Sequence, residues 1–232
     1  MSDEVLRQEK KFLMTIDKAY KLRHKLGEVL HKDENGGVNG YMIRSLYFDS
    51  LEERDFDEKL AGIESRRKIR LRNYGPDTDF AKLEMKQKQG MMQKKRSLKM
   101  SKDDALEMIY GNYSVLMRYS DPFAIECYSV MNMFCYRPKA VITYSRLPFV
   151  VKENKIRLTF DSDIRGTESF YDIFSRELTE VPLFDPYIVL LEVKFNGFLL
   201  SYIRDLLNTL DTSEVSLSKY CLGRKSTLDY VY

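Results

Sequence analysis

Lysine and arginine side chains recur at every second position in several segments of the chain. Lys68, Arg70 and Arg72 alternate with apolar residues, and Lys86 and Lys88 continue the pattern in a later segment. Because successive side chains of a β-strand point to opposite faces, this spacing gathers the charged groups of each segment on one face. Arginine grips phosphate oxygens through paired hydrogen bonds, and lysine neutralises them as a compact point charge. The spacing therefore predicts a sheet surface that binds a polyanion.

The positive charge is concentrated on one side of the predicted sheet. Sorted by strand parity, that side carries ten cations and four anions: Lys11, Lys68, Arg70, Arg72, Lys82, Lys86, Lys88, Arg146, Arg157 and Lys194 against Glu9, Glu84, Asp161 and Glu192. A solvated outer face explains any one strand, but the whole chain carries only +3, so it does not explain the concentration. If the sheet closes into a barrel, these cations line its interior, where they need anions to pair with them. The missing anion is then the ligand.

Period-two alternation of polar and apolar residues predicts eight strands: residues 6–14, 40–49, 66–74, 79–88, 93–100, 139–147, 154–162 and 187–195. Helices are predicted over residues 17–32, 169–178 and 198–210, and after two N-terminal caps, Ser101 and Asp121. No repeat or linker divides the chain, so we expect a single domain over residues 1–232. Many strands with a few covering helices predict an antiparallel α+β fold whose sheet closes into a barrel.

Composition and missing motifs exclude several classes of protein. With 44% hydrophobic residues the chain can bury a core, yet no apolar run reaches the roughly 18 residues of a membrane span. Cys127, Cys135 and Cys221 form no CxxC pair, which argues against a disulfide scaffold or zinc site and favours a cytoplasmic protein. His24 and His31 are interpreted as surface residues of a helix. P-loop, dinucleotide-binding, zinc-protease and serine-hydrolase motifs are missing.

Eight short motifs follow one another at compatible spacing between residues 6 and 220. They are Glu-x-Lys (9–11), Ser-Leu-Tyr-Phe-Asp (45–49), Arg-Lys-Ile-Arg-Leu-Arg (67–72), Leu-Glu-Met-Lys (83–86), Thr-Tyr-Ser-Arg (143–146), Arg-Leu-Thr-Phe-Asp (157–161), Leu-Glu-Val-Lys (191–194) and Ser-Lys-Tyr (218–220). In this order the chain resembles the polyphosphate polymerase domain of the vacuolar transporter chaperone (VTC) family. That family belongs to the triphosphate tunnel metalloenzymes, together with the CYTH-type triphosphatases and adenylate cyclases.

The resemblance implies an eight-stranded antiparallel β-barrel tunnel with flanking helices. Inside the tunnel, the terminal phosphoryl group of ATP would pass to a growing polyphosphate chain, with release of ADP, in the presence of Mn²⁺ or Mg²⁺. Catalytic roles are implied for Lys11, Arg70, Arg72, Lys86, Arg146, Arg157, Lys194 and Lys219. Phosphate binding is implied for Lys68, Lys95, Tyr47, Tyr144 and Ser218, and metal binding for Glu192 and Glu9.

Some of these residues have a second interpretation. Tyr47 and Tyr144 point to the basic face, where each either hydrogen-bonds phosphate or fills the wall. Lys95 lies among charged residues that also suit a solvated edge strand. Lys219 follows the last predicted helix, where a lysine is ordinarily a surface residue, so only the family pattern assigns it to the site.

The sequence of the first predicted strand differs from the pattern of the hydrolytic branch of these enzymes. That branch typically begins with Glu-x-Glu-x-Lys, whereas the same parity here is Arg7-x-Glu9-x-Lys11. The lost carboxylate removes a metal ligand, which favours phosphoryl transfer over hydrolysis. A triphosphatase of the same fold and a non-catalytic polyphosphate-binding subunit are the alternatives. A single-stranded RNA binder ranks last, because the basic face carries few aromatic residues.

The expected partners follow from the same pattern. ATP and polyphosphate are expected to bind, and nucleic acid is not. The yeast members of the family also carry a phosphate-sensing domain and membrane helices, which are not found in this chain. We therefore expect no membrane insertion by the chain itself, and peripheral attachment only through a membrane-protein partner.

Overall fold

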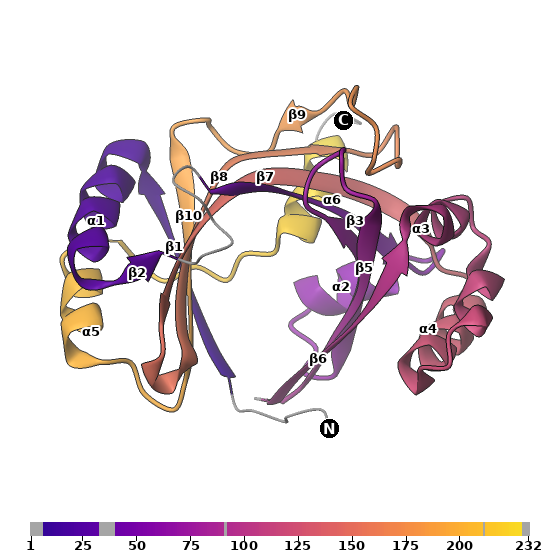
Figure 1. Ribbon diagram of the computed structural model, residues 1–232, viewed down its shortest axis with the longest axis horizontal. Helices are drawn as coiled ribbons and strands as arrows, with labels where there is room; N and C mark the ends of the chain where they lie inside the picture. The colour runs from indigo at the N-terminus through magenta and orange to yellow at the C-terminus, as the bar shows by residue number, and fades with distance from the viewer. Residues whose placement is uncertain (1–6, 33–39, 91, 211, 229–232) are drawn as a thin grey trace.

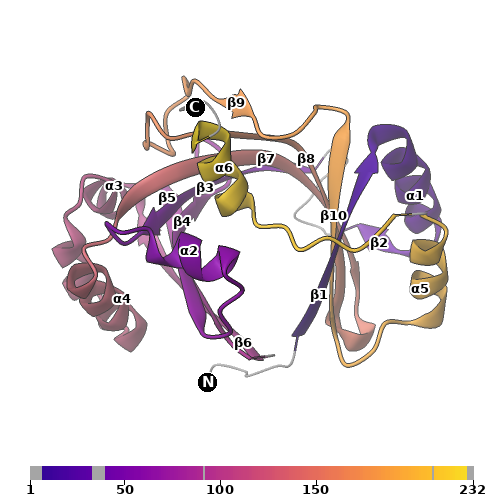
Figure 2. The same ribbon diagram turned by 180° about the vertical axis from the view of Figure 1, so that it is seen from behind.

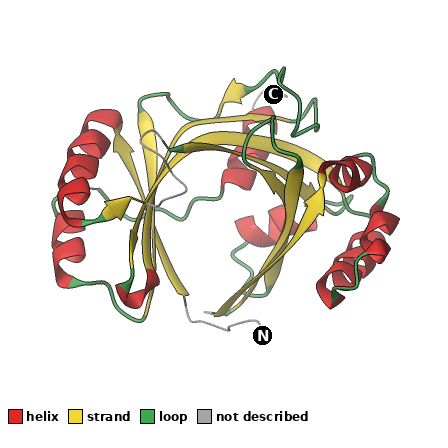
Figure 3. Ribbon diagram, viewed as in Figure 1, coloured by secondary structure: helices red, strands yellow, loops and turns green. Residues whose placement is uncertain are grey.

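The computed structural model describes residues 7–32, 40–90, 92–210 and 212–228, and its main feature is one curved antiparallel sheet (Figures 1 and 3). Eight long strands build it: β1 (Arg7–Thr15), β3 (Tyr41–Asp49), β4 (Arg66–Asn73), β5 (Phe80–Gln89), β6 (Met92–Ser101), β7 (Arg137–Val151), β8 (Ile156–Thr167) and β10 (Ile188–Asn196). Their spatial order is β1-β10-β8-β7-β3-β4-β5-β6. Two short strands extend the sheet, since β2 (His31–Lys32) pairs with β7 and β9 (Val181–Pro182) pairs with β8. All eight predicted strands are confirmed.

The sheet curves until its two end strands, β1 and β6, approach each other (Figure 1). Within the described ranges no backbone ladder joins these two strands. The gap is bridged by side chains, because Lys86 Nζ of β5 lies 3.0 Å from Glu9 Oε2 of β1. One edge of β1 pairs with β10, and on its other edge the Val215 amide of a later segment donates to the Lys11 carbonyl at 2.9 Å. The antiparallel tunnel fold is confirmed, but the predicted closed barrel is an open, curved sheet.

The apolar faces of the strands point outward and are covered by helices. Five elements make up this cover: α1 (Ile16–Val29), α3 (Lys102–Ile109), the 3-10 helix η2 (Tyr113–Arg118), α4 (Pro122–Met133) and α5 (Ser201–Asn208). One core joins Leu26 of α1 to Leu158 and Leu191 of the sheet, and a second joins Ile69 and Leu83 to the α3, η2 and α4 side. Because the side chains of these two cores lie outside the curve, the charged side chains that alternate with them lie inside it. A third core, with Ile142 and Leu190, packs against Tyr220 of α6.

Two helix starts follow the predicted capping chemistry. The Ser101 hydroxyl accepts a hydrogen bond from the Asp104 amide at 3.1 Å and begins α3. The Asp121 carboxylate accepts from the Phe123 amide at 2.9 Å and begins α4, with proline at the first helical position. No helix in the described part of the chain is both long and apolar enough to cross a membrane.

The helix predicted over residues 169–178 is wrong, because this segment is irregular. Arg44 of β3 donates to the carbonyls of Ile173 at 3.0 Å and Ser175 at 2.6 Å. Asn73 at the end of β4 donates to the same Ile173 carbonyl at 2.7 Å. Carbonyls that accept from buried sheet side chains do not need helical amides, and the segment is tied to the sheet instead.

Two helices were missed by sequence reasoning: α2 (Arg54–Leu60) and α6 (Lys219–Leu228). The buried Asp49 carboxylate at the end of β3 organises both of them. It accepts from the Asp55 and Phe56 amides of α2 at 2.9 Å each, and from the Tyr220 hydroxyl of α6 at 2.6 Å. Lys219, predicted to lie beyond the last helix, is therefore the first residue of α6.

Candidate functional site

The inner face of the curved sheet lines a cavity of about 1460 Å³. Among the described residues, its walls carry four glutamates, at positions 9, 84, 192 and 214, and sixteen cations: Lys11, Lys59, Arg66, Arg67, Lys68, Arg70, Arg72, Lys82, Lys86, Lys88, Lys95, Arg146, Lys155, Arg157, Lys194 and Lys219. This surplus of positive charge far exceeds the +3 of the whole chain. The cavity is therefore suited to a ligand of high negative charge.

The cavity brings together all fifteen site residues predicted from the sequence: Glu9, Lys11, Tyr47, Lys68, Arg70, Arg72, Lys86, Lys95, Tyr144, Arg146, Arg157, Glu192, Lys194, Ser218 and Lys219. The structure thus confirms that these side chains line one cavity, and their chemical roles stay predictions. Tyr47 and Tyr144 are only 5% and 2% exposed, so both form part of the wall. The Tyr47 hydroxyl also accepts a hydrogen bond from Arg70 at 3.0 Å.

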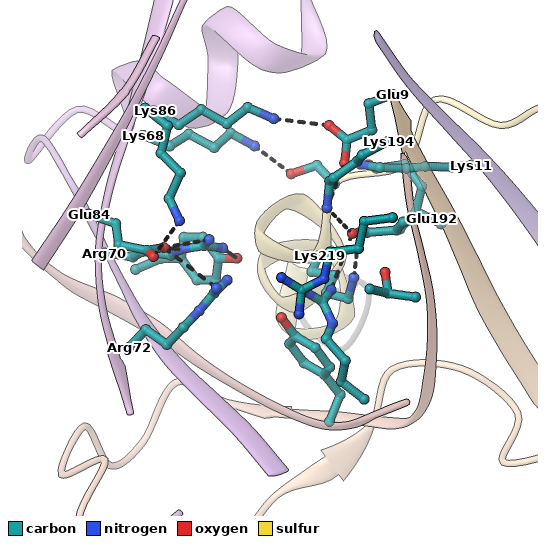
Figure 4. Close-up of a pocket in the computed structure, with 18 of the residues that line it drawn as sticks. Glu9, Lys11, Lys68, Arg70, Arg72, Glu84, Lys86, Glu192, Lys194 and Lys219 are labelled. Atoms are coloured by element: carbon teal, nitrogen blue, oxygen red, sulfur yellow. Dashed lines mark hydrogen bonds and ion pairs between the residues drawn. The ribbon is translucent and has the colours of Figure 1, made fainter. Parts of the chain in front are cut away.

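Two buried carboxylates, Asp161 and Glu192, hold three cations of the cavity (Figure 4). Arg146 donates to both oxygens of Asp161 at 2.6 Å and to Glu192 Oε2 at 3.2 Å. Lys219 Nζ lies 2.8 Å from Glu192 Oε1 and 2.6 Å from Asp161 Oδ2. Lys194 Nζ donates to Glu192 Oε2 at 2.7 Å. Side chains from β7, β8, β10 and α6 thus meet in one charged cluster.

The charges in this cluster stabilise one another. Burial opposes ionisation of Glu192, but Lys194, Lys219 and Arg146 hold the pKa of its carboxyl well below the usual range. Burial also opposes the charge of Lys219, but Asp161 and Glu192 raise the pKa of its ammonium group above the usual value. Both side chains are therefore ionised at neutral pH, and the cations are held in place before a ligand arrives.

A second cluster lies across the cavity, on β4, β5 and β6 (Figure 4). Glu84 accepts from Arg70 Nε at 2.8 Å and from Lys95 Nζ at 2.6 Å, and Arg72 Nη1 lies 3.7 Å away. Burial raises the pKa of Glu84, but Arg70, Arg72 and Lys95 outweigh it and hold that pKa well below the usual range. One glutamate on β5 therefore spaces three cations from the two strands beside it, β4 and β6.

The third cluster surrounds Glu9 at the gap between the sheet edges. Lys86 Nζ lies 3.0 Å from Glu9 Oε2, while Lys194 and Lys11 lie 3.5 Å and 3.7 Å from Oε1. Burial opposes the Glu9 charge, but Lys194, Lys11 and Lys86 lower the pKa of Glu9 to about 2. This carboxylate links the first and fifth strands electrostatically where the backbone does not.

Residues 212–218, here called the C-terminal strap, run from the side of α5 towards α6 across one end of the curved sheet (Figure 2). Lys11 Nζ donates to the Leu217 carbonyl at 2.7 Å, and Lys68 Nζ donates to Ser218 Oγ at 2.5 Å. Lys59 of α2 donates to Ser216 Oγ at 3.1 Å. Two lysines of the sheet and one of α2 therefore fix the strap and the start of α6.

Sequence reasoning missed some of the lining. Lys59 lies on α2, Lys155 lies on the 3-10 helix η3 (Glu153–Lys155), and residues 214–217 lie on the C-terminal strap. Period-two alternation selects residues within strands, so it carries no signal for a helix, a single turn or a loop. The exception is the Ser-Lys-Tyr motif, which the family resemblance placed in the site.

Glu9 and Glu192 are the two carboxylates predicted from the sequence to bind a divalent ion. In the described ranges no group of three or more histidine, cysteine, aspartate and glutamate side chains is arranged to hold a metal ion by itself. Glu9 and Glu192 line the same cavity, and each is held ionised by its neighbours. In phosphate-transfer sites Mg²⁺ commonly binds one or two carboxylates together with substrate phosphates. The two glutamates fit that mode rather than an all-protein cage.

Solved structures with the same fold include several described as candidate adenylate cyclases. One from Bacillus halodurans is 13% identical, with a TM-score of 0.57, and 94% of this chain aligns with 96% of that chain. One from Vibrio parahaemolyticus is 11% identical, with a TM-score of 0.51 and 95% and 98% coverage. A protein from Hippeastrum, described as a candidate adenylyl cyclase with a dominant triphosphatase activity, is 12% identical, with a TM-score of 0.56 and 94% and 95% coverage.

The sequence itself places the chain more narrowly. No curated protein matches it. The pattern that defines the VTC domain matches residues 6–228, which is nearly the whole chain and includes every strand and helix described above. This chain belongs to the VTC domain family and has the tunnel fold of the adenylate cyclase-like structures.

Proposed function

We propose that this protein is a metal-dependent polyphosphate polymerase, which transfers the terminal phosphoryl group of ATP to a growing polyphosphate chain and releases ADP. The observation that carries this proposal is the charge of the cavity, whose described walls hold sixteen cations and four glutamates. A ligand with many phosphate groups neutralises such a lining along its length. Membership of the VTC domain family supports the same class of substrate.

The extent of the cationic rows favours a polymer over a lone triphosphate. Along β4, the side chains of Arg66, Lys68, Arg70 and Arg72 all line the cavity. Six residues of strand span roughly 20 Å, which is longer than a triphosphate group. Some cations of this row therefore do not contact ATP when it is bound, and these can bind the polyphosphate chain that receives the phosphoryl group.

The proposed reaction needs no nucleophilic side chain. A terminal oxygen of the polyphosphate chain attacks the γ-phosphorus of ATP and forms a new P–O–P bond. The bond from the γ-phosphorus to the β–γ bridging oxygen breaks, and ADP leaves with its electron pair. Arg70 and Arg72 on one side of the cavity, and Lys194 and Lys219 on the other, would align the two anions and neutralise the transferring group (Figure 4).

Glu192 and Glu9 are the residues that would hold Mn²⁺ or Mg²⁺ together with substrate phosphates. The ion, when bound, supplies additional positive charge at the β- and γ-phosphate oxygens. Each carboxylate contacts a lysine: Glu192 contacts Lys194, and Glu9 contacts Lys86. Those ammonium groups are on flexible stems, so they could contact phosphate oxygens instead if the carboxylates held the ion.

A triphosphatase is the second candidate, because the Hippeastrum protein with the same fold is described as having a dominant triphosphatase activity. Hydrolysis would use water in place of the polyphosphate oxygen and would release free phosphate. In this chain the first strand offers the cavity one carboxylate, Glu9, where the hydrolytic pattern has two. That difference supports transfer, because a metal-activated water has fewer ligands to position it.

The test is to incubate the purified protein with ATP and Mn²⁺, and separately with Mg²⁺, and to resolve the products on a polyphosphate gel. We expect a ladder of chains, with ADP formed in the same molar amount as phosphate incorporated. Free phosphate without chains would assign the protein to the triphosphatase branch. Absence of both products, from protein that binds polyphosphate, would leave a binding subunit.

Glu192→Gln tests the metal assignment in the same assay. We expect at least a tenfold loss of metal-dependent turnover, with Glu28→Gln on the exposed side of α1 as the matched control. Glu192 is buried against three cations, so its loss also destabilises the fold. Thermal unfolding with and without tripolyphosphate separates an unfolded variant from a folded, inactive one. Full turnover in a folded Glu192→Gln protein would remove this residue from the metal site.

A further inference from the structure

Three aromatic side chains stand together in the wall of the cavity. Tyr41 begins β3, Tyr74 follows the end of β4, and Phe80 begins β5. The ring centroids of Tyr41 and Tyr74 lie 5.8 Å apart, and those of Tyr74 and Phe80 lie 6.2 Å apart. All three rings are half-buried, unlike the buried Tyr47 and Tyr144. They therefore present aromatic surface to the cavity rather than merely closing its wall.

The opposite end of the cavity has a different chemistry. Arg66 and Lys88 lie at the far ends of β4 and β5 from the aromatic rings, and Lys59 of α2 lines the cavity near the C-terminal strap. Figure 2 shows α2, the strap and α6 together at that end. Among the described lining residues, the aromatic ones are the three half-buried rings and the two buried tyrosines. The cavity thus has half-buried aromatic rings among its cations at one end and cations without such rings at the other, here called the cationic end.

We infer that Tyr41, Tyr74 and Phe80 form the subsite for the base of the nucleotide, an assignment that rests on the proposed use of ATP. Stacking on aromatic side chains is the usual way to hold a base without reading its identity. Tyr41 pairs in register with Arg146, so its ring lies beside the cluster around Glu192. Lys82, which contacts the Tyr74 ring, pairs in register with Arg72 of the cluster around Glu84. A base on the rings would therefore direct its phosphates to those arginines.

Cations already contact the same rings. Lys82 Nζ lies 5.4 Å from the Tyr74 ring centroid, and Lys99 Nζ lies 4.4 Å from the Phe80 centroid. Arg157 donates to the Tyr41 hydroxyl at 3.2 Å. A base that stacks on Tyr74 takes the place of Lys82, which also lines the cavity, and frees that ammonium group for the α-phosphate or ribose. The growing chain would then extend towards the cationic end, at Lys59 and Lys88.

The test compares two ligands that share the triphosphate and differ in the nucleoside. ATP and inorganic tripolyphosphate are titrated calorimetrically in EDTA, where turnover is prevented, into wild-type protein, Tyr74→Leu, Phe80→Leu and Tyr74→Phe. We expect each leucine variant to weaken ATP binding roughly tenfold, within the range for base–aromatic stacking, and to leave tripolyphosphate binding within twofold. Tyr74→Phe, which keeps the ring, should bind ATP like wild type. Tyr110→Leu, at a tyrosine 79% exposed and outside the cavity, is the matched control.

Each outcome bears on the subsite separately from the polymerase. Selective loss of ATP affinity supports the subsite even if no polyphosphate is ever formed. Equal weakening of both ligands would overturn it, because the rings would then act only by shaping the wall. Unchanged ATP affinity in both leucine variants, or a wild-type protein that binds neither ligand, would overturn it as well. A protein that makes polyphosphate while its leucine variants keep full ATP affinity would retain the proposed function and lose this subsite.

Discussion

Lys68 shows how a single side chain can make ligand binding depend on pH. Burial lowers the pKa of Lys68 to about 8. The Lys68 ammonium group is charged at pH 7 and largely neutral at pH 9 when the cavity is empty. Phosphate favours the charged form, so binding at pH 9 requires proton uptake that binding at pH 7 does not.

The prediction is that tripolyphosphate affinity falls as pH rises from 7 to 9, by up to roughly tenfold through Lys68. Lys68→Arg keeps its charge at both pH values, so the part of the pH dependence that comes from Lys68 should disappear. Calorimetry at pH 7 and pH 9 measures this. The ligand's own titration affects both proteins equally and cancels in the comparison. Lys25→Arg on the exposed face of α1 is the control. An identical pH profile for Lys68→Arg and wild type would refute the coupling.

Elements differed in how much of them the sequence could predict. Strand alternation follows directly from the pleat, so all eight strands and the inward row of Lys68, Arg70 and Arg72 were predicted. The irregular segment near Ile173 was not, because its carbonyls accept from Arg44, which is distant in sequence. The same holds for α2 and α6, which a buried aspartate at the end of β3 positions from outside their own segments.

The start of β3 has one further long-range requirement, at Gly40. Its φ is +81°, and a Cβ there would lie 2.3 Å from the carbonyl oxygen of Arg146 on β7. That contact is with backbone, so it cannot be relieved by turning a side chain. Gly197 provides a matched comparison, since its φ is +67° and a Cβ would meet nothing within 4 Å. Alanine substitutions at the two glycines therefore separate the cost of the left-handed backbone from the cost of the collision with the Arg146 carbonyl.

We therefore predict that Gly197→Ala costs about 1–2 kcal/mol of unfolding free energy, the penalty of a left-handed alanine. Gly40→Ala should cost at least twice as much, because β3 must also move away from β7. Since that movement displaces Arg146, tripolyphosphate affinity should fall in Gly40→Ala and not in Gly197→Ala. Urea unfolding and calorimetry measure the two effects. Equal losses in both variants would show that β3 and β7 accommodate the extra methyl group.

On the scale of the whole molecule, the fold encloses far more positive than negative charge within a sheet that backbone pairing does not close. Lys86 of β5 contacts Glu9 of the edge strand β1, and Glu84 and Glu192 each hold cations from several elements. Mutual repulsion among the remaining cations opposes folding, and a bound polyanion removes it. Any ligand that binds only the folded state also stabilises it by mass action. Ligand affinity and fold stability are therefore linked through the same lining.

This linkage predicts how thermal stability depends on polyphosphate length. At equal molar concentration, the midpoint of unfolding should rise from tripolyphosphate to longer chains and then level off, because phosphates beyond the cavity contact none of its cations. Half-molar salt should reduce the stabilisation but not remove it, since half-buried charges are screened less than exposed ones. Polyglutamate of matched charge is the control, and its bulk should keep it outside the cavity. If polyglutamate stabilised the protein as much as polyphosphate, the charge that matters would lie on the outer surface, and the cavity would no longer account for binding.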